Sequence, residues 1–355
     1  MDENKEPQNH QDYLPKSDVV SSIDSSVLKD SNDLQFKSRL DLSELQQSVQ
    51  KIKDEVGKVI VGQKDMVDML IASLLAKGHS LIEGVPGVAK TVTAKLLAKS
   101  LSVGFSRIQF TPDLMPSDIL GTSVFNLKTS EFEFKKGPIF SNMILIDEIN
   151  RAPAKTQAAL FEVMEEQQIT IDGNKFLLDS PFIVLATQNP VEQEGTYRLP
   201  EAQLDRFLFK IDVEYPNLEE EIEILSREHE LKDKQKTAEI TSFLSAEQII
   251  KYQKLVSQII IEKHLLKYIA ELIVSTRSNQ FLYLGASPRA SIAILKASKA
   301  FAAMSGRDFV TPEDIKRAAI PVLQHRVIVT PEREMEGVSS KQIIKQIIET
   351  VEIPR

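Results

Sequence analysis

The feature that most constrains this chain is an apolar run, a glycine-containing loop and a helical pattern in direct succession. HSLIEG at residues 79–84 is typical of a buried strand, GVPGVAKT follows at 84–91, and TVTAKLLAKSL at 91–101 has helical periodicity. A strand that leads through such a loop into a helix is suited to binding phosphate, because backbone N–H groups and the helix N-terminus converge on one point. The chain is therefore expected to contain a nucleotide-binding α/β fold.

The loop nearly fits the pattern G-x-x-x-x-G-K-[ST], with Ala89 at the place of the second glycine. We expect Ala89 to be tolerated at little cost if its φ is negative. Lys90 is predicted to neutralise the β- and γ-phosphates, and the Thr91 hydroxyl to bind Mg²⁺. The candidate phosphate-binding residues are Gly84, Val85, Pro86, Gly87, Val88, Ala89, Lys90 and Thr91.

A second acidic motif follows downstream, where MILIDE places Asp147 and Glu148 at the end of an apolar strand. Open α/β sheets bind ligands at the carboxyl ends of their strands. Because successive strand residues point opposite ways, Asp147 is predicted to hold Mg²⁺ and Glu148 to polarise the attacking water. Taken alone, the pair would favour an acidic strand end that faces solvent or caps the next helix. The upstream phosphate loop favours catalysis.

The central region alternates short apolar runs with amphipathic helical stretches. SRIQF at 106–110 and FIVLATQN at 182–189 are further predicted strands, and TQAALFEVMEEQ at 156–167 is a predicted helix. This alternation indicates a parallel sheet covered on both faces. Two stretches, 123–140 and 169–178, have hairpin patterns, the second with Asp172-Gly173-Asn174 at its turn. We expect both hairpins to be insertions on the sheet.

The flanking regions differ in pattern from this core. Residues 1–37 are polar and aperiodic, which predicts a disordered tail. Strands are expected to stop after about residue 212, and residues 216–355 show helical periods, including a helix start at Thr311-Pro312. The prediction is a tail at 1–37, an α/β core at 38–215 and an all-helical domain at 216–355.

Composition excludes several kinds of protein. Because the chain has no cysteine, it has no disulfide framework, zinc-thiolate site or cysteine nucleophile. Its net charge of −8 gives no basic field of the kind that binds nucleic acid. A secretory signal and an 18-residue uncharged apolar run are both absent. We therefore expect a soluble, cytoplasmic protein with no nucleic-acid partner and no membrane insertion.

The motifs together, over roughly residues 40–330, resemble the MoxR family of AAA+ ATPases. The matching segments are GVPGVAKT, GPIFSNMILIDEINRAPAKTQAALFEVMEEQQITIDG, LATQNPVEQEGTYRLPEAQLDRFLF and GASPRAS. An alanine before the phosphate-loop lysine is usual in this family. The resemblance implies an AAA+ phosphate-loop core with a parallel sheet and hairpin insertions, followed by a helical lid.

Four further site assignments come from the resemblance. Asn189 matches sensor 1, Arg206 matches the arginine finger that reaches the neighbouring subunit's nucleotide, and Arg289 matches sensor 2 on the lid. The segment that contacts adenine matches Val61, Gly62 and Gln63. Simpler roles stay open: Asn189 could cap a turn, Arg206 could form a local ion pair after Asp205, Arg198 is a rival finger, and residues 61–63 could be a plain helix-to-helix turn.

The resemblance implies an ATP hydrolase with ATP and Mg²⁺ as cofactors. It also implies a homo-oligomeric ring, expected to be a hexamer, because each nucleotide needs an arginine from the next subunit. Relatives are chaperone-like and remodel or mature client proteins through cofactor insertion, metal insertion or complex assembly, often with partners that contain a von Willebrand factor A domain. The alternatives are a magnesium-chelatase-like subunit, a nucleic-acid motor and an ATP-binding assembly module without hydrolysis.

Overall fold

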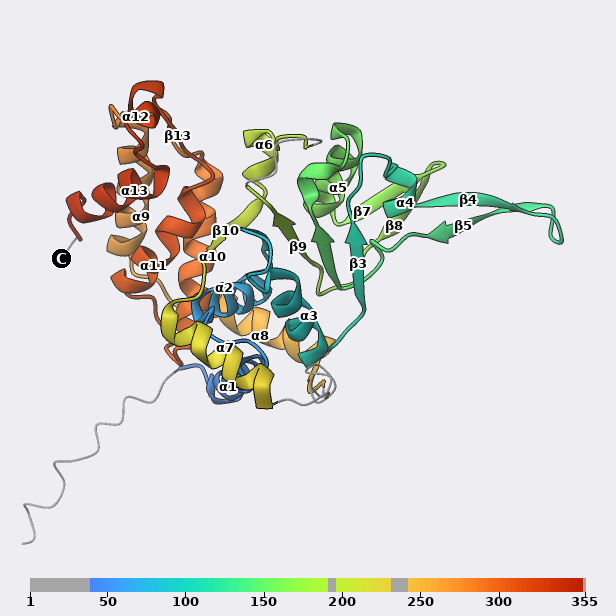
Figure 1. Cartoon of the computed structure of the whole chain (residues 1–355), viewed down its shortest axis with the longest axis horizontal. Helices are drawn as coiled ribbons and strands as arrows, with labels where there is room; N and C mark the ends of the chain where they lie inside the picture. Colours follow the sequence, from blue (N-terminus) through green and yellow to red (C-terminus); the bar gives the residue numbers. More distant parts are fainter. Residues whose placement is uncertain (1–38, 191–195, 231–241, 354–355) are drawn as a thin grey trace, which may run out of the picture. The chain divides into compact units, whose positions relative to one another are not determined.

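The computed structural model describes residues 39–190, 196–230 and 242–353 (Figure 1). The tail predicted for residues 1–37 lies outside these described residues. Arg39–Arg355 form one compact unit. Among the described residues, no helix is long and apolar enough to cross a membrane.

A five-stranded parallel sheet forms the centre of the fold, with the strand order β10-β1-β9-β6-β3. Its strands are β1 (His79–Gly84), β3 (Phe105–Gln109), β6 (Met143–Asp147), β9 (Ile183–Gln188) and β10 (Phe207–Val213). Neighbours in the sheet are distant in sequence, so the chain crosses over between them, as the alternating strands and helices predict. The predicted α/β class is confirmed.

Both faces of the sheet are covered because alternate strand residues enter two separate hydrophobic clusters. On β6, Ile144 and Ile146 pack in one cluster with α5 (Ala154–Glu166). Met143 and Leu145 pack in the other, with α2 (Lys64–Leu75), α3 (Lys90–Ser100) and α10 (Pro288–Met304). The apolar runs in the strands are continuous rather than alternating for this reason.

Both predicted hairpins are present. One consists of β4 (Gly121–Asn126) and β5 (Glu131–Lys136), and it projects away from the central sheet in Figure 1. The other consists of β7 (Gln168–Ile171) and β8 (Asn174–Leu177). The rings of Phe134 on β5 and Phe176 on β8 lie 4.4 Å apart, so the two hairpins contact each other near their bases.

The C-terminal region is a set of helices, in agreement with the predicted helical lid. They are α7 (Leu218–Glu230), α8 (Ala246–Gln258), α9 (Lys263–Ser278), α10, α11 (Pro312–Leu323), α12 (Pro331–Met335) and α13 (Ser340–Thr350). Thr311 is the N-cap of α11, and its backbone N–H donates to Asp314 at 2.9 Å, as the Thr-Pro start predicts.

The expectation that strands stop after residue 212 is wrong in detail. Three short strands follow: β11 (Leu244–Ser245), β12 (Leu282–Leu284) and β13 (Ile328–Val329). β11 pairs with β2 (Leu101–Ser102), and β12 pairs with β13. Strands of two or three residues are too short to show the period-2 pattern by which strands are recognised, so the sequence could not predict them.

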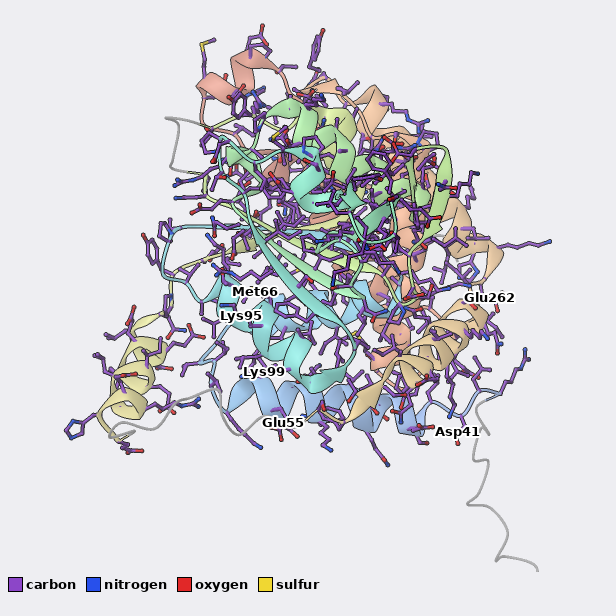
Figure 2. The ribbon with its side chains drawn as sticks, turned by 90° about the vertical axis from the view of Figure 1, so that its right-hand side faces the viewer. Asp41, Glu55, Met66, Lys95, Lys99 and Glu262 are labelled. Carbon is purple, nitrogen blue, oxygen red and sulfur yellow. The ribbon has the colours of Figure 1, made fainter. Side chains whose placement is uncertain are left out.

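The first two helices contact lid helices, and α2 also contacts strands β1 and β10 of the sheet. α1 (Ser43–Gly57) lies beside α3, as Figure 2 shows for Glu55 on α1 and Lys99 on α3. The hydroxyls of Ser48 on α1 and Tyr252 on α8 are 2.9 Å apart, and Gln253 of α8 donates to the carbonyl of Leu74 on α2. The domain boundary at 215/216 stays a prediction.

Candidate active site

The phosphate loop lies between β1 and α3, as the sequence predicts. Gly87 and Ala89 both have left-handed backbones, with φ of 90° and 60°. The condition under which Ala89 would cost little, a negative φ, is therefore not met, and an alanine in this region costs about 1–2 kcal/mol. Such turns direct successive N–H groups toward one anion. Lys90 Nζ donates to the carbonyls of Gly84 and, at 3.0 Å, Val85, so its ammonium lies inside the loop.

Thr91 and Asp147 lie in direct contact. Thr91 Oγ1 donates to Asp147 Oδ1 at 2.7 Å, and Arg107 Nε on β3 donates to Asp147 Oδ2 at 2.6 Å. Thr187 Oγ1 on β9 lies 3.3 Å from Asp147 Oδ1. The Asp147 carboxylate is nearly fully buried, and these donors fix its orientation.

This pair of oxygens fits a magnesium ion that also binds nucleotide phosphates. Mg²⁺ is usually held by one or two carboxylates, with phosphate and water oxygens filling the remaining positions. The Thr91 hydroxyl and the Asp147 carboxylate supply that chemistry at the edge of the phosphate loop. Among the described residues there is no group of three or more His, Asp or Glu side chains that could hold a metal ion.

Glu148 lies beside this pair but is no longer on the strand. β6 ends at Asp147, and Glu148 has φ 58° and ψ 52°, so strand alternation does not set its direction as expected. A hydrogen bond from its backbone N–H to Thr187 Oγ1 holds the turn. Its Oε2 accepts from Gln109 Nε2 at 2.8 Å and lies 3.0 Å from Arg151 Nε. The carboxylate is partly exposed and therefore open to water.

Asn189 follows directly after β9, which lies between β1 and β6 in the sheet. It is therefore at the same edge as the phosphate loop and Asp147. Its side chain is largely buried. The position agrees with the predicted sensor, whereas its role stays a prediction.

Val61, Gly62 and Gln63 connect α1 to α2, and Gln63 lies at a cavity of about 570 Å³. Gln63 Nε2 donates to the carbonyl of Glu214 at 3.1 Å, and Gly62 has φ 69°. The cavity is also lined by Tyr215 and by lid residues of α11 and α13. It adjoins the end of β10, which pairs with the end of β1 at Gly84, so a base here would lie near the phosphate loop.

Arg206 and Arg289 lie at the amino ends of the sheet strands, opposite the end that carries the phosphate loop. Phe207 on β10 pairs with His79 at the start of β1, whereas the phosphate loop follows the end of β1. Arg206 Nη2 is 2.9 Å from Glu165 Oε2, and Arg289 Nη2 is 2.7 Å from Glu165 Oε1. The two arginines therefore converge on one carboxylate, away from the phosphate loop of their own subunit.

Several cations surround these two arginines. A cavity of about 250 Å³ at this edge is lined by five basic side chains and by the carboxylates of Glu165 and Asp205. The basic residues are Lys77, Arg206, Arg289, Lys296 and Arg326. An excess of positive charge in a hollow surface favours a phosphate-bearing group.

Asp205 forms its ion pair with Arg326 rather than with Arg206, which pairs with Glu165. Asp205 Oδ1 accepts from the buried Arg326 at 2.7 Å, and Asp205 Oδ2 accepts from Ser287 Oγ at 3.2 Å. Ser287 is the N-cap of the helix that carries Arg289. The segment beside Arg206 is thus bound to the lid. The rival Arg198 is exposed near the start of α6 (Glu201–Leu204).

Comparison with known proteins identifies the two parts of the fold and the family. Residues 79–209 match the ATPase family associated with various cellular activities (AAA), and residues 274–347 match the AAA lid domain. Chaperone MoxR1 of Mycobacterium tuberculosis is 43% identical over 85% of this chain and 81% of its own length. The chain belongs to the MoxR family of AAA+ ATPases.

Two further relatives cover most of the chain. YeaC of Bacillus subtilis is 46% identical over 86% of this chain and 94% of its own length. The crystal structure of a candidate ATPase from Cytophaga hutchinsonii is 44% identical, has a TM-score of 0.81, and covers 88% of this chain and 97% of its own. The AAA+ core with a helical lid is therefore confirmed.

The sequence reasoning missed four side chains that hold the candidate site: Arg107, Gln109, Glu165 and Thr187. Arg107 and Gln109 alternate on an edge strand, so they face the same side next to Asp147 and Glu148. That alternation was visible in SRIQF once the strand was placed. The contact of Glu165 with two arginines had no sequence signal, because it joins three distant segments.

Proposed function

We propose that this chain is a Mg²⁺-dependent ATP hydrolase that acts as a homo-oligomeric ring, a hexamer, and remodels or matures client proteins. The observation that carries the proposal is the separation of two half-sites. The phosphate loop lies at the carboxyl ends of the sheet strands, and Arg206 and Arg289 lie at their amino ends. Neither half is complete, so head-to-tail contact between subunits would assemble the whole site.

In the proposal, the first half-site binds ATP and activates the attacking water. In the proposal, the loop N–H groups and Lys90 hold the phosphates, while Thr91 and Asp147 hold Mg²⁺. When bound, the ion neutralises developing charge on the phosphate oxygens. Glu148 orients the attacking water and accepts its proton, with Gln109 and Arg151 fixing the carboxylate.

Asn189 and the adenine segment complete this half-site. Asn189 would donate to the γ-phosphate or to the water from the strand between the two motifs. Gln63, which lines the cavity next to Tyr215, would contact adenine there together with the adjacent Val61 and Gly62. These roles rest on the match with family motifs and on the position of each residue.

The second half-site acts on the neighbouring subunit's nucleotide. Arg206 would supply positive charge to the γ-phosphate in the transition state, where a finger of this kind contributes about 10³–10⁵ in rate. Arg289 would act with it, because both side chains reach the same carboxylate at 2.7–2.9 Å. Arg326, Asp205 and Ser287 would couple this edge to the lid, so that loss of the γ-phosphate changes the lid.

Work would reach a client through the hairpins. The β4-β5 hairpin exposes Phe125 and Phe132, whose rings are 5.2 Å apart. Exposed aromatic side chains of this kind mark interaction surfaces. The relative named Chaperone MoxR1 supports a client protein as the partner, and we extend this to partners with a von Willebrand factor A domain.

ATP binding and hydrolysis by two variants test the proposal. Lys90→Ala should lose ATP binding, and Glu148→Gln should retain binding while losing turnover, because Glu148 acts mainly on the transition state. Lys99→Ala, on the exposed face at the end of the same helix, is the matched control and should resemble the wild type. Equal ATP affinity for Lys90→Ala and wild type would contradict the phosphate site.

A further inference from the structure

Glu165 is a carboxylate between two arginines that come from different parts of the fold. It is the second-last residue of α5. Arg206 immediately precedes β10, and Arg289 is in the first turn of the lid helix α10. Each arginine uses its Nη2 atom on a different oxygen of the same carboxylate, at 2.9 Å and 2.7 Å.

The contact solves an electrostatic problem. Without a negative charge between them, the guanidinium groups of Arg206 and Arg289 would repel each other. The negative charge of Glu165 offsets that repulsion and orients both guanidinium groups toward the same carboxylate. An arginine spreads its donors in a rigid fork, so a carboxylate fixes its orientation as well as its position.

α5 also holds Arg206 from a second direction. Arg206 Nη1 donates to the backbone carbonyl of Phe161, one turn before Glu165 on the same helix. The Arg206 side chain is 29% exposed, whereas that of Arg289 is 54% exposed. The end of α5 thus forms a rigid support for Arg206, and Arg289 depends on the Glu165 carboxylate for its placement beside it.

We propose that Glu165 is a positioning residue for hydrolysis in the neighbouring subunit: it aligns Arg206 and Arg289 as one unit that meets the γ-phosphate. The inference rests on the proposed function, because it requires the arginines to act across the subunit interface. Misplacing a catalytic group by about 1 Å can cost on the order of 100-fold in rate. Loss of Glu165 therefore lowers kcat. ATP affinity is unchanged, because it depends on the subunit's own phosphate loop.

The experiment measures steady-state ATPase kinetics of Glu165→Ala, Glu165→Gln and Glu166→Gln in the full chain with Mg²⁺ and ATP. Glu165→Ala should lower kcat about 10- to 100-fold with an unchanged KM. Glu165→Gln, which keeps the shape and loses the charge, should be intermediate. Glu166→Gln removes the same charge at the next position of the helix and should match the wild type. Because Glu165 is partly exposed, the melting temperatures should agree.

Mixed rings show in which subunit Glu165 acts. Lys90→Ala subunits should not bind ATP but keep Glu165 and both arginines. Mixing them with Glu165→Ala subunits should give more activity than the sum of the two alone, because intact arginine units then face nucleotides bound by the Glu165→Ala subunits. A wild-type kcat for Glu165→Ala, a raised kcat, or no gain on mixing overturns the inference.

The same mixing separates this inference from the proposed function. Arg206→Ala subunits mixed with Lys90→Ala subunits should also recover activity. If that pair recovers while Glu165→Ala has wild-type kinetics, only the role of Glu165 is wrong. If neither pair recovers, the action of the arginines across the interface is wrong as well.

Discussion

Thr91 Oγ1 donates a 2.7 Å hydrogen bond to Asp147 Oδ1, which joins the first turn of α3 to the end of β6 across 56 residues of sequence. The contact brings together the hydroxyl and the carboxylate assigned to one metal ion. Arg107 holds the second oxygen of Asp147 at 2.6 Å, so the carboxylate cannot rotate freely. The two oxygens are therefore pre-placed, and ion binding would require only that the Thr91 proton turn away.

Thr91→Ala should lose the dependence of ATP affinity on Mg²⁺. Removal of the hydroxyl takes away one oxygen ligand but leaves Lys90 and the loop N–H groups in place, so affinity measured in EDTA should stay near that of the wild type. Turnover should fall at least about 10-fold. Titration calorimetry with and without Mg²⁺ measures the difference, and Thr91→Ser, which restores the hydroxyl, is the control. A wild-type response of Thr91→Ala to Mg²⁺ would remove Thr91 from the metal site.

Arg206→Ala and Arg289→Ala should bind ATP nearly normally and hydrolyse it slowly. The arginines lie away from their own phosphate loop, so their loss should appear in kcat rather than in affinity. A surface ion pair contributes only about 0–1 kcal/mol, too little to explain a large loss through folding. Arg198→Ala serves as the comparison. If Arg198→Ala is inactive and Arg206→Ala has wild-type turnover, the finger is Arg198.

The parts of the fold that the sequence predicts are those with local signals. Continuous apolar runs mark β1, β6 and β9, and turn residues mark the β7-β8 hairpin. The positions of Lys90 and Asp147 follow from the sequence because each lies at a fixed distance from a strand end, whereas their roles stay predictions. Local signals of this kind do not depend on how distant segments pack.

The parts that escaped prediction depend on tertiary contacts. The left-handed turn at Glu148 replaces the expected strand alternation because Thr187 of the adjacent strand holds its N–H. The convergence of Arg206 and Arg289 on Glu165 requires the lid to pack against the sheet. Ala89 adopts φ 60°, a conformation that alanine does not favour and that no local sequence signal indicates.

Stability should fall below about pH 6.5 because of buried His79. Burial lowers its pKa to about 4, and its ring bonds Met164 and Val184 backbone groups in the neutral form. The unfolded chain takes up a proton near pH 6.5, whereas the folded chain stays neutral until about pH 4. The free energy of unfolding should therefore drop by about 2 kcal/mol between pH 8 and pH 5. Burial lowers the pKa of His325 in the same direction and adds to the loss.

Urea unfolding at several pH values measures this dependence. His79→Gln should be less stable at pH 8 but should lose less stability on acidification, because the group that titrates on unfolding is gone. His264→Gln, at an exposed position of α9, is the control and should keep the wild-type slope. A wild-type slope in His79→Gln would assign the acid sensitivity to other groups.

The β4-β5 hairpin bears on the alternative function of a nucleic-acid motor. Some of its side chains support that alternative, and others argue against it. Phe125 and Phe132 are 45% and 74% exposed, and aromatic faces of this kind can stack on single-stranded bases. Lys135 and Lys136 lie on the same hairpin. However, Phe125 and Phe132 already pack edge to face on each other. Glu131 and Glu133 flank Phe132 on β5 and, by strand alternation, project from the opposite face of the hairpin, so they add negative charge that would repel a phosphate backbone bound to it.

We therefore expect DNA and RNA to leave the ATPase rate unchanged at about 0.15 M salt, whereas a client protein raises it. Affinity for a phosphate backbone requires clustered Lys and Arg and falls steeply with salt, and on this hairpin Lys135 and Lys136 are matched by Glu131 and Glu133. Phe125→Ser/Phe132→Ser should keep the basal rate, because both side chains are exposed, and should lose stimulation by the client. Several-fold stimulation by nucleic acid that disappears in Lys135→Glu/Lys136→Glu would replace the chaperone assignment with the motor, because a ring could gather these lysines from every subunit around its pore.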